Sequence, residues 1–182
     1  MKLSAGRVIF GTGDVIGYGV CFSLSKNIIK KAGPLMGRLL LGGELAFETG
    51  VKNPKVMNPS VEEFFSKTFN HISNTILFAN VTYYPIRKGL FEGLNISVGP
   101  SIGYTFQSIE RQASRIFISG LQIYIRQSYL DYLNSILIGY RISAGYEYVI
   151  RKRILIGFRL DFSSHTNGDI NTLAGLKTGF TF

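Results

Sequence analysis

Long apolar runs, cysteine and charged residues are all scarce in this sequence. The longest apolar run is four residues, whereas a membrane-spanning helix needs about 20, so a helical crossing is excluded. A single Cys in 182 residues excludes a disulfide scaffold and a cysteine-rich zinc module. Charged residues make up 17% of the chain, below the usual ~25%, while an aromatic content of 13% excludes a disordered chain. One folded domain over residues 1–182 is therefore expected.

Glycine and positive charge are abundant. The chain has 21 Gly and a formal net charge of +9, and its mean hydropathy is +0.18. A basic chain of positive hydropathy points toward a membrane. A nucleic-acid partner is not expected, because such a surface interleaves basic and aromatic residues and the short basic segments of this sequence lack that pattern.

Alternation with period two is the dominant pattern, and it predicts antiparallel strands. Eight segments carry it, at residues 3–11, 16–25, 38–48, 73–84, 94–107, 136–148, 154–163 and 173–182. Residues 115–126 also alternate, so either 3–11 or 115–126 supplies the eighth strand. Pro100 lies inside one predicted strand, and a bulge or kink is expected there because proline cannot donate to the ladder.

The two faces of these strands differ in size as well as polarity. One set is bulky Ile, Leu, Val, Phe and Tyr, and the other is mostly Gly and Ser with isolated charges. Small residues suit the narrow interior of an eight-stranded barrel, and bulky apolar residues suit acyl chains. We therefore expect an all-β, eight-stranded antiparallel up-and-down transmembrane barrel, closed so that every backbone group is paired.

The predicted inward set contains eight charged residues. Four are positive and four negative: Arg38, Arg141, Arg159, Lys177, Glu44, Glu48, Glu147 and Asp161. Because buried charges need partners, we expect a balanced network across the lumen. Its role is a structural plug, which we favour, or else a proton or ion relay or a catalytic acid–base pair.

The final strand, residues 173–182 (LAGLKTGFTF), resembles the C-terminal signature of bacterial outer-membrane barrels. The resemblance implies that Phe180 and Phe182 form a signal read by the barrel-assembly machinery. The whole chain is similar to the small OmpX/OmpA-type barrels, particularly the "outer membrane β-barrel domain" proteins of Bacteroidota. This similarity implies that the protein lies in the outer membrane of a Gram-negative cell and contacts outer-membrane lipid or lipopolysaccharide. The opening residues lack the apolar core of a signal peptide, so we expect a mature chain.

If the last strand ends with Phe182 on the periplasmic side, the connections between strands lie alternately on the two sides of the membrane. Residues 50–71, 108–134 and 164–171 are then outer loops. The periplasmic connections then hold a basic rim with +7 of the net charge, formed by Lys26 and by Lys30, Lys31, Arg87, Lys88, Arg151, Lys152 and Arg153, against Glu92. This rim either contacts anionic lipid or an acidic partner, or consists of solvated turns.

No catalytic, metal or cofactor constellation stands out in the sequence. The segment 163–168 (SSHTNG), with His165, resembles the His-x-Ser-Asn motif of lipid A deacylases, but its spacing differs, since Thr166 follows His165 directly and Asn167 comes one place early. We therefore expect a non-enzymatic outer-membrane protein with neither cofactor nor metal. It acts through its outer loops or in a complex with other outer-membrane proteins. A small porin-like channel is the first alternative, and a lipid A deacylase-like enzyme the second.

Overall fold

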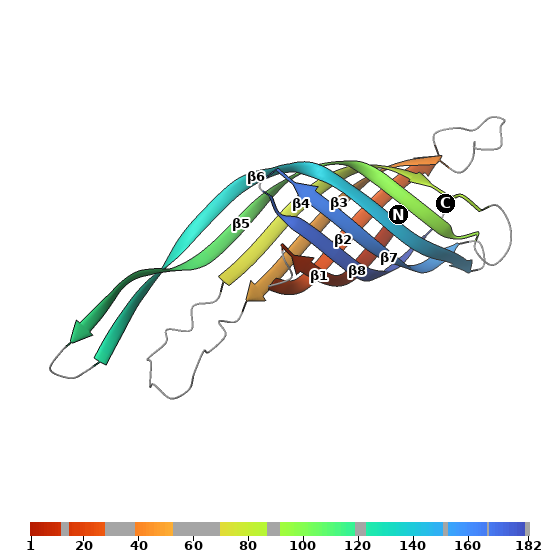
Figure 1. Ribbon diagram of the computed structural model, residues 1–182. Coiled ribbons are helices and arrows are strands. Elements are labelled where there is room, and N and C mark those ends of the chain that lie inside the picture. Colours follow the sequence, from red (N-terminus) through yellow and green to blue (C-terminus); the bar gives the residue numbers. More distant parts are fainter. Residues whose placement is uncertain are drawn as a thin grey trace.

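The computed structural model is a closed barrel of eight antiparallel strands, in which each strand pairs with its sequence neighbours (Figure 1). The strands are β1 Lys2–Phe10, β2 Val15–Asn27, β3 Leu39–Lys52, β4 Asn70–Tyr83, β5 Leu94–Ile118, β6 Ile123–Ile150, β7 Ile154–His165 and β8 Ile170–Phe180. The structure describes residues 1–11, 15–27, 39–52, 70–86, 92–118, 123–150, 153–166 and 168–180. For 27, 52, 70, 109–118 and 123–130 it describes only the backbone. The expected fold class is confirmed.

Pairing between the first and last strands closes the sheet. All nine residues of β1 pair with β8, from Lys2 opposite Gly179 to Phe10 opposite Asn171. The N-terminal segment is therefore the eighth strand of the wall, which decides between the two candidates that the sequence left open.

Of the other candidate, residues 115–118 and 123–126 pair with each other in a hairpin that extends β5 and β6 beyond the barrel (Figure 1). The described pairing of β4 with β5 ends at Ser108, and that of β6 with β7 begins at Gly139. We call the end of the barrel with this hairpin the hairpin end. The opposite end, where Met1 and Phe180 lie (Figure 1), is the terminal end.

Pro100 does not produce the expected bulge. Its register with Tyr140 on β6 is continuous, and the shift in that pairing lies between Gln112 and Ser114. On the other side, no β4 partner is described for Gly99 or Pro100, although the register is the same before and after them. The missing N–H thus interrupts the ladder with β4 without adding a residue.

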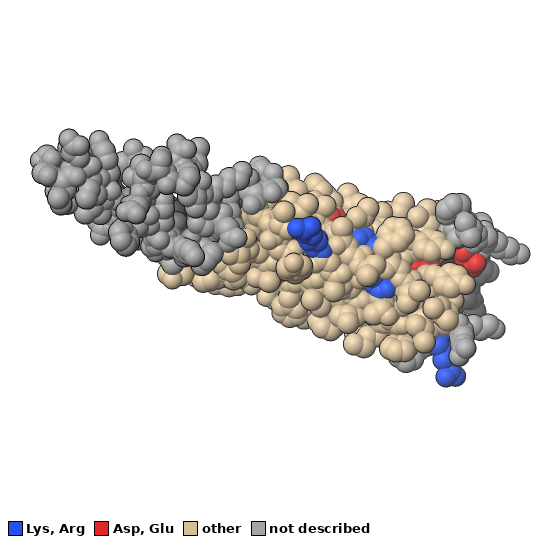
Figure 2. All heavy atoms as spheres, turned by 90° about the horizontal axis from the view of Figure 1, so that it is seen from below, with Lys and Arg blue, Asp and Glu red and all other residues tan. Residues whose placement is uncertain are grey.

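The barrel is apolar outside and polar inside, as the two residue sets predicted. Outward side chains such as Ile138, Phe158 and Leu176 are 55%, 50% and 75% exposed. Figure 2 shows a wall in which charged residues are sparse. Among the described residues, no helix has the length and apolarity that crossing a membrane requires.

Candidate functional site

The predicted charge network lies in the lumen. Of the eight predicted residues, six have buried side chains that face inward: Glu44, Glu48, Arg141, Glu147, Arg159 and Asp161. Lys177 is partly buried and also faces inward. Arg38 lies outside the described residues. The strand alternation therefore identified the correct face for every predicted lumen residue that the structure describes.

Arg159 on β7 is the centre of the first cluster. Its Nε donates to Asp161 Oδ1 at 2.9 Å while Nη2 pairs with Oδ2, so that one edge of the planar guanidinium group binds both oxygens of the carboxylate. Its Nη1 donates across the lumen to Glu44 Oε2 on β3 at 3.0 Å and to Ser4 Oγ on β1 at 2.9 Å. Three strands of the wall are thus joined through one side chain.

Arg141 on β6 completes this central cluster. Its Nη1 pairs with Glu44 Oε1 and lies 3.7 Å from Asp161 Oδ2. Its Cζ lies 3.6 Å from the ring centroid of Phe78 on β4, a cation–π contact. Two arginines and two carboxylates, all at least 95% buried, therefore neutralise one another in the middle of the lumen.

Glycine gives these long side chains room. Arg159 is paired with Gly145 on β6 and with Gly175 on β8. Arg141 is likewise opposite Gly99 on β5. Since neighbouring inward positions carry no side chain, the guanidinium groups can cross the narrow lumen. The high glycine content is thus partly a requirement of the charge network.

A second cluster lies nearer the terminal end, around Glu147 on β6. Lys2 Nζ lies 2.8 Å from both carboxylate oxygens, and Lys177 Nζ lies 2.7 Å from Oε1. The hydroxyl of Tyr84, which follows β4, donates to Oε2 at 2.8 Å. Burial, and then the negative charge of Glu147, raise the pKa of the Tyr84 phenol, which keeps it a proton donor.

Lys2 and Tyr84 were not among the predicted site residues. Lys2 has the same parity as the inward residues Ser4 and Val8, so extending the alternation by one residue would have found it. With Lys2, the described inward charges again sum to zero, four against four. Tyr84 is the last residue of the predicted segment 73–84 and has the parity of the inward residues Phe78 and Asn80. It was missed because only charged residues were assigned to the network.

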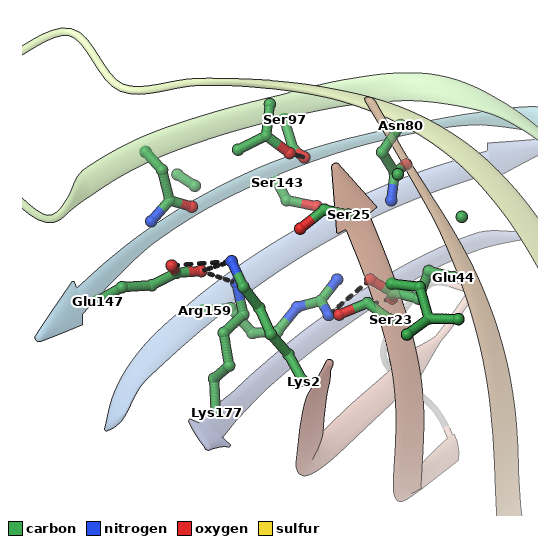
Figure 3. Close-up of a pocket in the computed structure, with 16 residues that line it drawn as sticks. Lys2, Ser23, Ser25, Glu44, Asn80, Ser97, Ser143, Glu147, Arg159 and Lys177 are labelled. Carbon is green, nitrogen blue, oxygen red and sulfur yellow. Dashed lines mark hydrogen bonds and ion pairs between the residues drawn. The ribbon is translucent and has the colours of Figure 1, made fainter. Parts of the chain in front are cut away.

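A small cavity separates the two clusters (Figure 3). Its volume is about 30 Å³, and its lining includes Ser23, Asn80, Ser97 and Ser143 beside Glu147 and Arg159. A water molecule needs roughly 10–15 Å³ by the same measure. The cavity therefore has room for about two water molecules.

Glu48 is held differently from the other acids of the lumen. Its Oε2 accepts from Asn171 Nδ2 at 3.0 Å and from Asn74 Nδ2 at 3.4 Å. No Lys or Arg of the described chain forms an ion pair with it. The Oδ1 atoms of both asparagines are buried without a hydrogen-bond partner. Amide dipoles, rather than opposite charges, hold this carboxylate.

Apolar side chains also pack in the hairpin half of the lumen, beside Glu48 and its two asparagines. They form one buried cluster whose members nearest the hairpin end are Val8, Phe10, Ile72, Ile76, Leu137 and Leu173. Each is at most 9% exposed. The sequence analysis did not identify this apolar plug, because the inward positions of most other strands are small or polar.

The Ser163–His165 pair does not form a catalytic arrangement. The Oγ of Ser163 donates to the carbonyl of Asn171 at 3.4 Å. Both ring nitrogens of His165 are buried without a hydrogen-bond partner, whereas a nucleophilic serine requires a hydrogen-bonded base. His165 ends β7 with its side chain in the lumen, which corrects its assignment to a loop. Within the described ranges, no group of His, Cys, Asp and Glu that could hold a metal is present.

Most of the predicted basic rim lies outside the described residues. This applies to Lys30, Lys31, Arg87, Lys88, Arg151 and Lys152, and also to Phe182. Arg153 is described and exposed, in the turn between β6 and β7 at the terminal end. Phe180 ends β8 with an outward side chain that is 59% exposed.

Comparisons with known proteins show a similarity in fold only. No protein-family model matches the chain, and no curated protein matches it in sequence. The crystal structure of Neisserial surface protein A is similar over 100% of this chain and 95% of that chain, with a TM-score of 0.57 and 10% identity. The structure of the attachment invasion locus protein of Yersinia pestis, solved with a heparin analogue, is similar over 100% of this chain and 97% of that chain, with a TM-score of 0.50 and 10% identity. The chain therefore shares its barrel fold with these small outer-membrane proteins.

Proposed function

We propose that this protein is a non-enzymatic integral protein of the outer membrane of Gram-negative bacteria that interacts through its hairpin end. The observation that carries the proposal is the inverted polarity of the barrel. Bulky apolar side chains cover the outside, while eight charged side chains lie inside. A water-soluble barrel of this size has the opposite distribution, whereas a lipid-embedded barrel requires this one.

The hairpin supports an interaction role. Beyond the barrel, its described backbone pairs only within the hairpin, from Gln112 opposite Ser128 to Ile118 opposite Ile123. A two-stranded ribbon leaves the hydrogen-bonding groups of both outer edges available to an extended segment of a partner. Under the proposed orientation, the hairpin projects from the cell surface.

The closed lumen argues against the channel alternative. The apolar plug occupies the hairpin half, and side chains joined by ion pairs occupy the terminal half. Ions crossing the barrel would have to disrupt both. We therefore expect no stepwise conductance in planar lipid bilayers, and reproducible conductance steps would favour the channel.

Assembly is proposed to depend on the end of β8. The side chain of Phe180 is exposed on the outer wall next to the β1–β8 closure, where an assembly factor could reach it. Contacts of the basic rim with anionic lipid and membership of the Bacteroidota group remain predictions.

The membrane assignment can be tested in cells and in detergent. We expect the protein to fractionate with outer membranes and to migrate faster on gels when it is not boiled. Protease added to intact cells should cleave within the hairpin. The matched control replaces residues 111–129 with Asn-Gly, since Glu110 and Leu130 are paired and this dipeptide closes a two-residue hairpin. A water-soluble monomer would exclude the proposal, and cleavage only after lysis would reverse the orientation.

A further inference from the structure

Arg7 is a charged residue on the apolar outer wall. It lies inside β1, five residues after Lys2 and three before Phe10, and its side chain is exposed on the outward face. Among the described outward positions of the barrel wall, only Arg7 and Lys26 carry a charge. Lys26 is at the terminal end of β2, next to its last residue. Arg7 is therefore the one described cation in the interior of this wall.

The position is unfavourable unless an anion is supplied from outside the chain. In a lipid-facing position, an arginine costs most at the bilayer midplane and little at the interface. No carboxylate of the described residues forms an ion pair with Arg7. Of the nine residues of β1, Arg7 is nearer the hairpin end, so its long side chain can reach the interface on that side.

Hydroxyl-bearing residues lie on the β2 side of Arg7. Tyr18 on β2 is its cross-strand partner and is 73% exposed. Thr49 is paired with Tyr18 from β3, and its Oγ1 lies 3.0 Å from His71 Nε2. On the other side, Ala174 faces Arg7 directly. A cation, the exposed hydroxyl of Tyr18 and a small residue lie side by side on the outer wall and form a site for an anionic head group.

Phosphate is the anion that fits this arrangement best. The guanidinium fork binds two phosphate oxygens at once, and hydroxyls supply further donors. A second copy of this chain fits poorly, because no Asp or Glu is present among the described outward positions of the barrel wall. In a symmetric dimer that buried this face, Arg7 would meet the same face of the partner copy and find no carboxylate there.

We propose that Arg7, with Tyr18, binds a phosphate group of a phosphorylated glycolipid in the leaflet at the hairpin end. This inference rests on the proposed membrane location, and lipid A is the probe of that chemical class. Arg7 supplies the charge-assisted pair, Tyr18 a hydroxyl donor, and Ala174 the space for the head group against the wall.

The experiment measures lipid binding by the full chain folded in maltoside micelles, which contain no phosphate. Lipid A with both phosphates and dephosphorylated lipid A are titrated into the wild-type protein and three variants, and bound lipid is counted by native mass spectrometry. For Arg7→Gln we expect affinity for the phosphorylated lipid to fall about tenfold or more, since a hydrogen bond to a charged group has this strength. Arg7→Lys, which keeps the charge without the fork, should lie between wild type and Arg7→Gln.

Lys26→Gln is the matched control, because Lys26 is the other cation among the described outward positions and lies at the opposite end. Its affinity should stay within about twofold of wild type, as expected for a surface charge far from the site. Dephosphorylated lipid A should bind wild type as weakly as phosphorylated lipid A binds Arg7→Gln. The faster migration of unboiled protein verifies that each variant is folded before titration.

Several results would overturn the inference. These are unchanged lipid A affinity in Arg7→Gln, an equal loss in Lys26→Gln, or equal affinity for phosphatidylglycerol and lipid A. Cross-linking of position 7 in native membranes to another protein instead of glycolipid would also overturn it. If wild type does not enter membranes at all, the proposed function fails. If wild type enters them and Arg7→Gln binds normally, only this inference fails.

Discussion

The two halves of the lumen are filled in different ways. The terminal half contains two clusters of oppositely charged side chains around Arg159 and Glu147, with a small polar cavity between them. The hairpin half contains the apolar plug, in which Ile76 and Leu137 are fully buried. Glu48 lies in this region, where Asn74 and Asn171 hold it.

This difference shows that two kinds of packing can block the lumen of a narrow barrel. Apolar packing excludes water and carries no charge, but it places no directional link between strands that are far apart in the barrel. The ion pairs supply such links, because Arg159 on β7 reaches β1 and β3 directly. Both Lys2 on β1 and Lys177 on β8 bind Glu147 on β6, so this cluster also braces the β1–β8 closure.

The largest effect is expected from breaking the central cluster. Glu44→Gln removes the carboxylate that both Arg141 and Arg159 contact, which leaves uncompensated buried positive charge. We expect a loss of about 3–5 kcal/mol in the free energy of unfolding. Urea titration of the protein in lipid vesicles measures it. A loss equal to that of Glu48→Gln would contradict the distinction between the two halves.

The next effect is expected from the apolar plug. Ile76→Ala removes buried methyl groups from a fully buried position, and a cavity of this kind costs about 2–5 kcal/mol. Since no charge changes, the loss should be independent of ionic strength in the same urea titration. A loss that varied with salt would show that the plug depends on the ion network.

A smaller effect is expected at the second cluster. Glu147→Gln leaves Lys2 and Lys177 without their shared anion, but both lysines are partly exposed and can be hydrated. We expect a loss of about 1–2 kcal/mol, which should shrink in high salt because salt screens the repulsion between the two lysines. Lys2→Met, which removes one of these cations, should partly restore the stability of the Glu147→Gln variant.

The smallest effect is expected at Glu48. In Glu48→Gln the remaining oxygen still accepts from an asparagine amide, and the new NH₂ group can donate to the unpartnered Oδ1 of Asn74 or Asn171. The free energy of unfolding should change by less than about 1 kcal/mol. Glu48→Leu, which removes both acceptors, should be more damaging than Glu48→Gln. The opposite order would show that the amides do not stabilise this carboxylate.

Much of the fold was predictable because a strand has only two faces. The alternation around Arg141 and Arg159 assigned both to the lumen, and in the structure both side chains are buried there. The cluster around Glu147 was predicted only in part, since Lys2 lies just outside the predicted segment 3–11 and Tyr84 is uncharged and was not assigned to the network. Residues 108–134 were expected as an outer loop, or 115–126 as a strand of the wall, so the continuity of the hairpin with β5 and β6 was not predicted.

The sequence by itself determined which side chains face the lumen, because period two leaves no other choice once the outer face is apolar. Only the tertiary structure decided which of them meet. Contacts across the lumen depend on the tilt and stagger of the strands, which set the height of each residue along the barrel axis. Alternation contains no information on that height. This is why Arg159 meets Glu44 and Ser4, from distant parts of the chain, whereas Glu48 on the same strand as Glu44 meets only amides.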